Sequence, residues 1–242
     1  MKILLTRPIH DSIITSKTLS QIGIETLIVP FLEISSVNYQ ELKILKSDYI
    51  MFTSKNAVNF FKFEKQFQNN LVFSVGSETK KILQEKGFKN IINADENLER
   101  LLILSKNQLK KGDVVIHPTY KSSNLKIRNF FLSLGCKYFA IKCYSSKMIC
   151  RNRDKLILFM KNTKKSMIAF YSPLTARSFV NQIQKMNLIK FCKDKSFVVI
   201  SNKVKEEITK LGKLSVYVAG KPNQKEMLEL MKEKFQLGKK IG

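Results

Sequence analysis

The chain has 242 residues, of which 44% are hydrophobic and 26% charged. This is the composition of an ordinary globular protein with enough core for one large or two small domains. No apolar run approaches the ~20 residues that cross a bilayer, which excludes the usual helical membrane proteins. The net charge of +24 suits an anionic partner, such as nucleic acid, an acidic membrane surface or a polyanionic substrate. The 37 lysines and six arginines are scattered, however, and drift in an A/T-biased genome explains the charge equally well.

Short β-rich runs alternate with amphipathic helical patterns along the chain. The predicted strands are 2–5, 25–29, 48–52, 71–75, 114–116, 138–142, 166–170, 196–200 and 215–218. Helical patterns lie between them, for example at 78–86, 124–134 and 202–211, and a last helix is predicted to begin near Asn223, with Glu226 in capping-box position. Glycines follow several helical patterns as stop signals: Gly23, Gly87, Gly135 and Gly212. This alternation favours an α/β fold with parallel sheets.

The chain also repeats itself. Residues 1–36 (A) resemble 112–146 (A′), and 48–104 (B) resemble 166–235 (B′); "IMFTSKNAVNFF" aligns with "AFYSPLTARSF" in the second pair. Two similar α/β domains are therefore predicted. Periodicity alone leaves open whether A pairs with B or with B′.

Small polar residues follow at least five of the predicted strands. At the carboxyl edge of a parallel sheet, such residues cap helices and can meet a ligand, because helix N-termini converge there and attract anions. Simple N-capping explains each junction taken alone, but six junctions in two matching sets favour a polar cleft between the domains. The candidate binding residues are Thr6, Arg7, Thr53, Ser54, Lys55, Asn56, Gly76, Ser77, Tyr171, Ser172, Thr175, Ser201, Asn202, Lys203 and Lys221.

Sharper catalytic motifs are missing. The sequence has no G-x-G-x-x-G, no P-loop and no G-x-S-x-G elbow. Cysteines and histidines are not spaced as metal ligands, so no metal site is predicted: Cys136, Cys143, Cys150, Cys192, His10 and His117. Free, buried thiols fit a reducing compartment, and the start "MKILLTRPIH" is too short for a signal peptide, so a cytoplasmic location is expected.

The ordered set "ILLTRP", "YIMFTSKNAVNFF", "FSVGSETKKILQEKGF", "YSPLTARSF", "VISNKVKEEI" and "AGKPNQKEMLELM" resembles the uroporphyrinogen-III synthase family over practically the whole chain. The resemblance implies a hydro-lyase of haem biosynthesis that needs no cofactor. Such an enzyme closes linear hydroxymethylbilane into uroporphyrinogen III with loss of water, inverting the last pyrrole ring through a spiro intermediate. A substrate with eight carboxylates fits a basic cleft lined by N–H groups.

The resemblance also implies an architecture: two flavodoxin-like, parallel-sheet domains joined by a two-stranded linker. A then pairs with B′, so residues 1–33 and 150–242 form one domain and 38–143 form the other. The crossings are 31–37 and 143–149.

Two catalytic side chains carry over from the resemblance. Tyr144, in "IKCYSS", matches a tyrosine proposed to assist loss of the hydroxyl, and a phenol can donate a hydrogen bond to the leaving oxygen. Thr79 matches a threonine at the start of a helix. Packing for Tyr144 and capping for Thr79 are equally open readings. Departures from the family pattern are Val204, where relatives often have threonine, and "HPTY" after Ile116, where a glycine is expected.

Rival functions belong to other classes. A non-catalytic tetrapyrrole-binding relative would keep the fold and lose turnover. A nucleic-acid-binding protein would use the charge but should show clustered basic residues with interleaved aromatics. We therefore expect a monomer that acts on a small polycarboxylate, with the upstream bilane-forming enzyme as a candidate partner and with neither nucleic acid nor membrane.

Overall fold

The computed structural model describes residues 2–39, 47–62, 65–95, 97–120, 124–149, 151–163 and 165–240. It divides into two compact units. Unit 1 comprises Met1–Glu33 and Lys147–Gly242, and unit 2 comprises Ile34–Ser146. Position 150, at the predicted domain boundary and the site of the fourth cysteine, lies outside the described residues.

Unit 1 contains a five-stranded parallel sheet in the order β2-β1-β10-β11-β12. Its strands are β1 (Ile3–Leu5), β2 (Thr26–Ile28), β10 (Ser166–Phe170), β11 (Lys195–Val199) and β12 (Ser215–Val218). Its helices are α1 (Ile9–Ser20), α6 (Arg153–Asn162), α7 (Pro173–Lys185), α8 (Asn202–Thr209) and α9 (Gln224–Lys240), with a 3-10 turn at Ile189–Cys192. This 2-1-3-4-5 strand order is the flavodoxin-like one.

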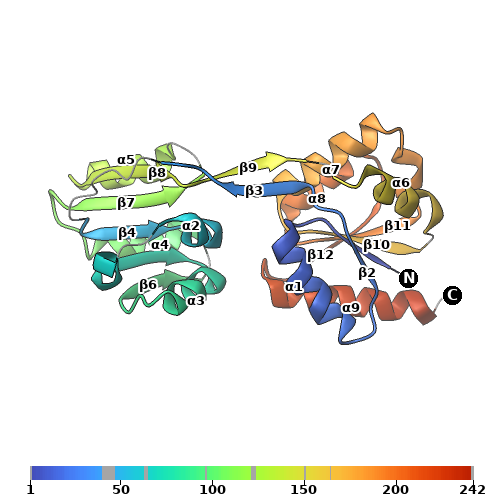
Figure 1. Ribbon diagram of the computed structural model, residues 1–242, viewed down its shortest axis with the longest axis horizontal. Helices are drawn as coiled ribbons and strands as arrows, with labels where there is room; N and C mark the ends of the chain where they lie inside the picture. Colours follow the sequence, from blue (N-terminus) through green and yellow to red (C-terminus); the bar gives the residue numbers. More distant parts are fainter. Residues whose placement is uncertain are drawn as a thin grey trace. The chain divides into compact units, whose positions relative to one another are not determined.

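The strands of unit 1 are mainly apolar because helices cover both faces of the sheet (Figure 1). Along β1, Leu4 packs toward the face where α7 supplies Phe179, whereas Ile3 and Leu5 pack toward the face where α9 supplies Met227. This alternation follows from the two-residue period of a strand and fixes the register of β1 against β10.

Unit 2 has a second five-stranded parallel sheet, in the order β8-β7-β4-β5-β6. Its strands are β4 (Tyr49–Phe52), β5 (Leu71–Val75), β6 (Ile91–Ala94), β7 (Val114–Thr119) and β8 (Lys137–Lys142). Its helices are α2 (Lys55–Phe60), α3 (Ser77–Glu85), α4 (Leu98–Lys106) and α5 (Leu125–Ser133), with a 3-10 turn at Lys65–Asn69. In this sheet β8 and β7 take the places that β2 and β1 have in unit 1, and β4, β5 and β6 take those of β10, β11 and β12. The difference is that the central strand, β4, comes first in the chain.

Two chain segments connect the units and pair with each other as β3 (Leu32–Ser36) and β9 (Tyr144–Met148). The N–H of Val37 donates to the carbonyl of Cys143, and that of Ile149 donates to the carbonyl of Phe31, both at 3.1 Å. These bonds define an antiparallel ladder. Part of the backbone of each connection is therefore hydrogen-bonded to the other connection.

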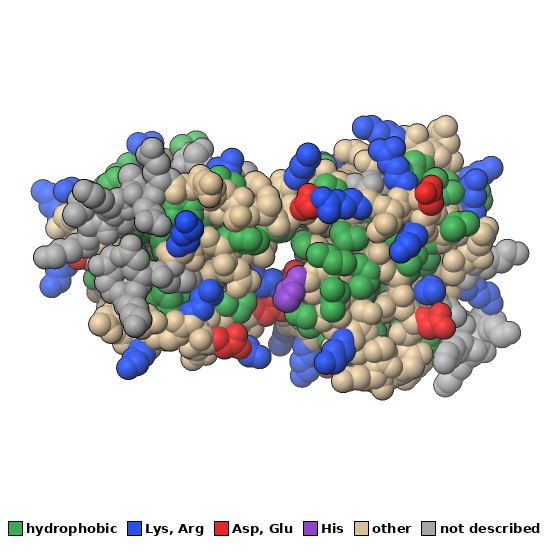
Figure 2. Space-filling view, viewed as in Figure 1, with side chains coloured by type: hydrophobic (Ala, Val, Ile, Leu, Met, Phe, Trp, Pro, Cys, Tyr) green, Lys and Arg blue, Asp and Glu red, His purple; other side chains and the backbone are tan. Residues whose placement is uncertain are grey.

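Lysine and arginine side chains are spread over the face drawn in Figure 2 rather than gathered into one patch. Within the described residues, no helix is long and apolar enough to cross a membrane. The described cysteines, Cys136, Cys143 and Cys192, are free and buried.

Candidate active site

The carboxyl edge of the unit 1 sheet carries the first group of predicted binding residues. They follow four neighbouring strands, and the chain reverses its winding between β1 and β10, where ligands of open α/β sheets bind. Arg7 follows β1, Tyr171 follows β10, Ser201 lies just beyond β11, and Lys221 lies beyond β12.

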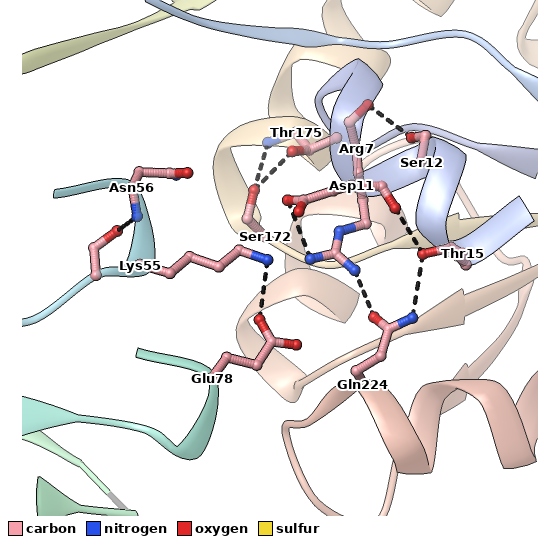
Figure 3. A network of polar contacts seen from close by, with 11 residues as sticks. Arg7, Asp11, Ser12, Thr15, Lys55, Asn56, Glu78, Ser172, Thr175 and Gln224 are labelled. Atoms are coloured by element: carbon pink, nitrogen blue, oxygen red, sulfur yellow. Dashed lines mark hydrogen bonds and ion pairs between the residues drawn. The ribbon is translucent and has the colours of Figure 1, made fainter. Parts of the chain in front are cut away.

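Arg7 is held on several sides (Figure 3). Its Nη1 donates to Oε1 of Gln224 at the start of α9, and its Nη2 lies 3.2 Å from Oδ2 of Asp11 in α1. Its guanidinium carbon is 4.2 Å from the centre of the Tyr171 ring, a cation–π contact. Only 11% of its side chain is exposed. Through these contacts, Arg7 joins α1, α9 and the segment that follows β10.

Tyr171 is half-buried and lies beneath Arg7, and its hydroxyl oxygen is buried. Its hydroxyl lies near Thr15, Arg7 and Gln224 without hydrogen-bond geometry to any described group. Burial raises the pKa of Tyr171 to about 12, and the nearby charge of Arg7 opposes that rise. Tyr171 therefore stays a neutral phenol, whose ring serves as the platform for Arg7.

The small polar residues of unit 1 divide into two kinds. The hydroxyl of Thr6 donates to the carbonyl of Ala169 at 2.6 Å, and Ser172 caps α7 by accepting from the N–H of Thr175 at 3.1 Å. These hydroxyls have internal roles. By contrast, Ser201 begins α8 in extended conformation without a side-chain cap bond. Around that helix start, Asn202 and Lys203 are exposed, as is Lys221 after β12, so these side chains can reach a ligand.

In unit 2, Tyr144 reaches the start of α2 from β9. Its hydroxyl donates to Oγ of Ser54 at 3.3 Å, and Ser54 also caps α2 by accepting from the N–H of Asn56 at 3.2 Å. The Tyr144 ring lies 6.0 Å from that of Phe60 and 5.9 Å from that of Tyr120. Burial raises the pKa of Tyr144, and the bond to Ser54 opposes the rise, so the phenol is protonated at neutral pH and can donate.

The neighbouring helix α3 contributes the remaining residues of this edge. Nζ of Lys55 forms an ion pair with Oε2 of Glu78 at 2.9 Å, which ties the start of α2 to the start of α3. Gly76 precedes α3 with φ +86° and ψ 144°, a conformation open essentially to glycine alone. It is followed by Ser77 and by Thr79, which is buried in the first turn of the helix.

A buried histidine stands beside Thr53, at the end of β4. Nε2 of His117 lies 3.1 Å from Oγ1 of Thr53, and its Nδ1 lies 2.6 Å from the hydroxyl of Tyr138. His117 is 1% exposed, and burial lowers its pKa to about 4, so the imidazole is neutral at physiological pH.

The model of the family "Uroporphyrinogen-III synthase HemD" matches residues 15–229. The chain belongs to the uroporphyrinogen-III synthase family. The predicted family is thereby confirmed, and with it an enzyme family of haem biosynthesis.

A curated relative is the porphyrin biosynthesis protein HemD of Ruminiclostridium josui. It is 25% identical over 96% of this chain, and the chain spans 48% of that protein's length. Two crystal structures share the fold. Uroporphyrinogen-III synthetase from Helicobacter pylori 26695 has a TM-score of 0.63 and 20% identity, covering 96% of this chain and 98% of that one. A mutant uroporphyrinogen III synthase from Thermus thermophilus has a TM-score of 0.58 and 12% identity, covering 98% and 99%. The predicted two-sheet α/β fold is confirmed.

For this member of the uroporphyrinogen-III synthase family, the structure brings some of the predicted site residues into contact with one another and pairs another with a residue outside the predicted set. Tyr144 contacts Ser54, and Arg7 contacts Tyr171, but Lys55 is paired with Glu78. All the site assignments stay predictions.

Sequence reasoning missed His117, which it weighed only as a metal ligand. Its position in the fold could have indicated a role, because His117 lies near the end of β7, which is paired with β4, and Thr53 directly follows β4. Within the described residues, no three His, Cys, Asp or Glu side chains are grouped to hold a metal ion.

Proposed function

We propose that this protein is a uroporphyrinogen-III synthase, which converts hydroxymethylbilane to uroporphyrinogen III and one water. The observation that carries the proposal, beside membership of the family, is the hydroxyl of Tyr144. It is buried and protonated, and it lies 3.3 Å from Ser54 at the carboxyl edge of the unit 2 sheet. A donor of this kind suits a reaction that begins with departure of a hydroxyl.

In the proposed reaction, the carbon–oxygen bond of the hydroxymethyl group breaks and the oxygen leaves as water; the proton that it gains is balanced by the proton that the bilane loses when the ring closes. The Tyr144 phenol stabilises the departing oxygen by a hydrogen bond. Because its pKa is raised, it acts as a hydrogen-bond donor rather than as a strong acid. The last ring then closes in inverted orientation through a spiro intermediate. No redox partner is required, and we propose that neither metal nor cofactor takes part.

The remaining task is to hold a flexible bilane in one geometry, since uncatalysed closure gives the uninverted isomer. We propose that the start of α8 and Lys221 bind carboxylates of the bilane. The supporting observation is that Ser201 forms no cap bond there and that Lys203 and Lys221 are exposed.

A direct assay tests this function. Purified protein is incubated with freshly generated hydroxymethylbilane, without metal or nucleotide, and the products are oxidised and separated as porphyrin isomers. The synthase must shift the product from the type I to the type III isomer, and EDTA should leave that shift unchanged. Type I product at the rate of the blank would contradict the proposal; saturable binding of the bilane without turnover would identify a tetrapyrrole-binding relative instead.

Three finer proposals concern the setting of the reaction. We propose a cytoplasmic enzyme, supported by the free buried thiols of Cys136, Cys143 and Cys192. We also propose that it acts as a monomer and receives its unstable substrate from the upstream bilane-forming enzyme. Light scattering of the purified protein, alone and mixed with that enzyme, tests both.

A further inference from the structure

We propose that His117 is a positioning residue for the proposed reaction: with Tyr138 behind it, it fixes the Thr53 hydroxyl as a hydrogen-bond donor toward a carboxylate of the substrate. The inference rests on the proposed function for the identity of the ligand. The hydrogen-bond relay itself is a property of unit 2 alone.

The three side chains form one line across neighbouring strands. Tyr138 belongs to β8, His117 to β7, and Thr53 directly follows β4, so the line runs from an edge strand toward the centre of the sheet. His117 is 1% exposed, whereas Thr53 is half-buried at the carboxyl edge. The Tyr138 ring is stacked on Phe131 at 5.6 Å, which holds the phenol in place.

The two hydrogen-bond lengths favour one direction of the relay, and with it the tautomer that we propose. A separation of 2.6 Å between the Tyr138 oxygen and Nδ1 is typical of an O–H donor, whereas 3.1 Å between Nε2 and the Thr53 oxygen is typical of an N–H donor. Burial raises the pKa of Tyr138, so this phenol keeps its proton. Tyr138 therefore donates to Nδ1, the single imidazole proton sits on Nε2, and Nε2–H donates to Thr53.

The direction decides what Thr53 offers. When its oxygen accepts from Nε2–H, the hydroxyl proton is left for another partner, and Thr53 binds a carboxylate. In the opposite tautomer, Thr53 would donate to Nε2 and present only lone pairs, which repel a carboxylate. The buried His117 and the half-buried Tyr138 thus decide whether Thr53 donates a hydrogen bond to an acidic substrate or presents lone pairs to it.

The tautomer is read directly by nitrogen NMR of protein labelled with ¹⁵N-histidine. The exposed His10 is the internal reference, and His117→Gln identifies the signals of the buried ring. We expect a neutral His117 ring with Nε2 protonated and Nδ1 bare between pH 6 and 8, and a loss of that single tautomer in Tyr138→Phe. A wild-type ring protonated on Nδ1 overturns the inference, whether or not Tyr138→Phe folds.

Kinetics then test the effect on substrate. Tyr138→Phe and Thr53→Val should each raise KM for hydroxymethylbilane about tenfold or more, as for loss of one hydrogen bond to a charged acceptor, with kcat less affected. The double variant should be no worse than Thr53→Val alone, because both changes remove the same contact. Additive losses overturn the relay.

Tyr49→Phe is the matched control. Tyr49 belongs to the same sheet and donates its hydroxyl to the carbonyl of Gln108, so this variant also loses one tyrosine hydrogen bond. It should leave the His117 tautomer and KM unchanged. A wild-type protein that yields only the type I isomer would refute the proposed function, while the NMR result would still decide the direction of the relay.

Discussion

The Tyr144 hydroxyl is where the proposed chemistry can be separated from packing. Tyr144→Phe keeps the ring between Phe60 and Tyr120 and removes one 3.3 Å hydrogen bond to Ser54. We expect turnover to fall ~10²-fold, as for loss of a positioned donor, while unfolding free energy falls by about 1 kcal/mol. Isomer-resolved assays and urea denaturation of the same preparation measure both. A near wild-type rate would reduce Tyr144 to a packing residue.

His117 makes stability depend on pH. Its pKa is about 4 in the folded protein against about 6.5 in an unfolded chain, so between these values the unfolded state binds the extra proton. Above pH 6.5 the ring is neutral in both the folded and the unfolded state, so it does not make stability depend on pH. Below pH 6.5 the unfolding free energy declines as the pH falls toward 4, by about 3 kcal/mol in all. Urea denaturation of wild type and His117→Gln at pH 7, 5.5 and 4.5 checks this. The unfolding free energy of wild type relative to that of His117→Gln should fall as the pH is lowered. A difference that stays constant with pH would contradict this expectation.

At the scale of elements, the start of α3 depends on the backbone of Gly76. With φ +86° and ψ 144°, any side chain there is strained by about 1–3 kcal/mol, although a Cβ would meet no atom within 4 Å. Gly76→Ala should therefore destabilise the protein through the backbone alone. The control is Gly220→Ala, a glycine outside the positive-φ group that would contact only the end of the Glu226 side chain. Equal losses for the two variants, measured by urea denaturation, would contradict the strain argument.

The element boundaries show what the sequence could predict. Apolar strands that are buried on both faces were found: 71–75 and 166–170 match β5 and β10 to the residue. The predicted cap of the last helix is confirmed, since the N–H of Glu226 donates to Asn223. β6 was missed. It is an edge strand whose sequence, "IINA", is short and only partly buried, so it carries neither a long apolar run nor a clear alternation.

Helix α1 shows the limit of the hydrophobic pattern. Its buried face carries Ser12 and Thr15, while Ile9 and Ile13 are 56% and 53% exposed. The hydroxyls of Ser12 and Thr15 donate to the carbonyls of Arg7 and Asp11, and this satisfies them inside the fold. Such back-bonding cannot be read from hydrophobicity. The Arg7 cluster was missed for a related reason: Gln224 and Asp11 meet Arg7 from elements at opposite ends of the chain.

At the scale of the whole molecule, the charge of +24 gives a salt prediction. If the exposed lysines help to bind a substrate with eight carboxylates, KM should rise several-fold between 50 and 500 mM KCl, because charges are screened within ~10 Å at 0.1 M and within ~4 Å at 0.5 M. The turnover number should change less. Sucrose at matched osmolality is the control. A KM that does not change with salt would indicate that the net charge reflects composition and does not contribute to substrate binding.

The domain organisation gives a second prediction at this scale. We propose that units 1 and 2 are the two domains, of which unit 1 is built from both ends of the chain. A circular permutant that starts at residue 47, with residues 242 and 1 joined by about 15 Gly/Ser residues, makes unit 1 continuous in the chain; such a linker spans roughly 20 Å. It should fold and unfold with nearly wild-type cooperativity. Failure to fold, measured by circular dichroism, would contradict the proposed division.

The two sheets have the same spatial order, although their strands follow one another differently in the chain. A single ancestral domain made of A followed by B, duplicated and fused, explains both facts if the copies exchanged halves, so that A packs with B′ and A′ with B. This is domain swapping within one polypeptide. Under that assumption, β3 and β9 correspond to the segments that turned back from A to B in the single domain, which would explain why each joins two units and why they pair with each other. On this history, the double connection is a relic of a swapped dimer rather than a device added later.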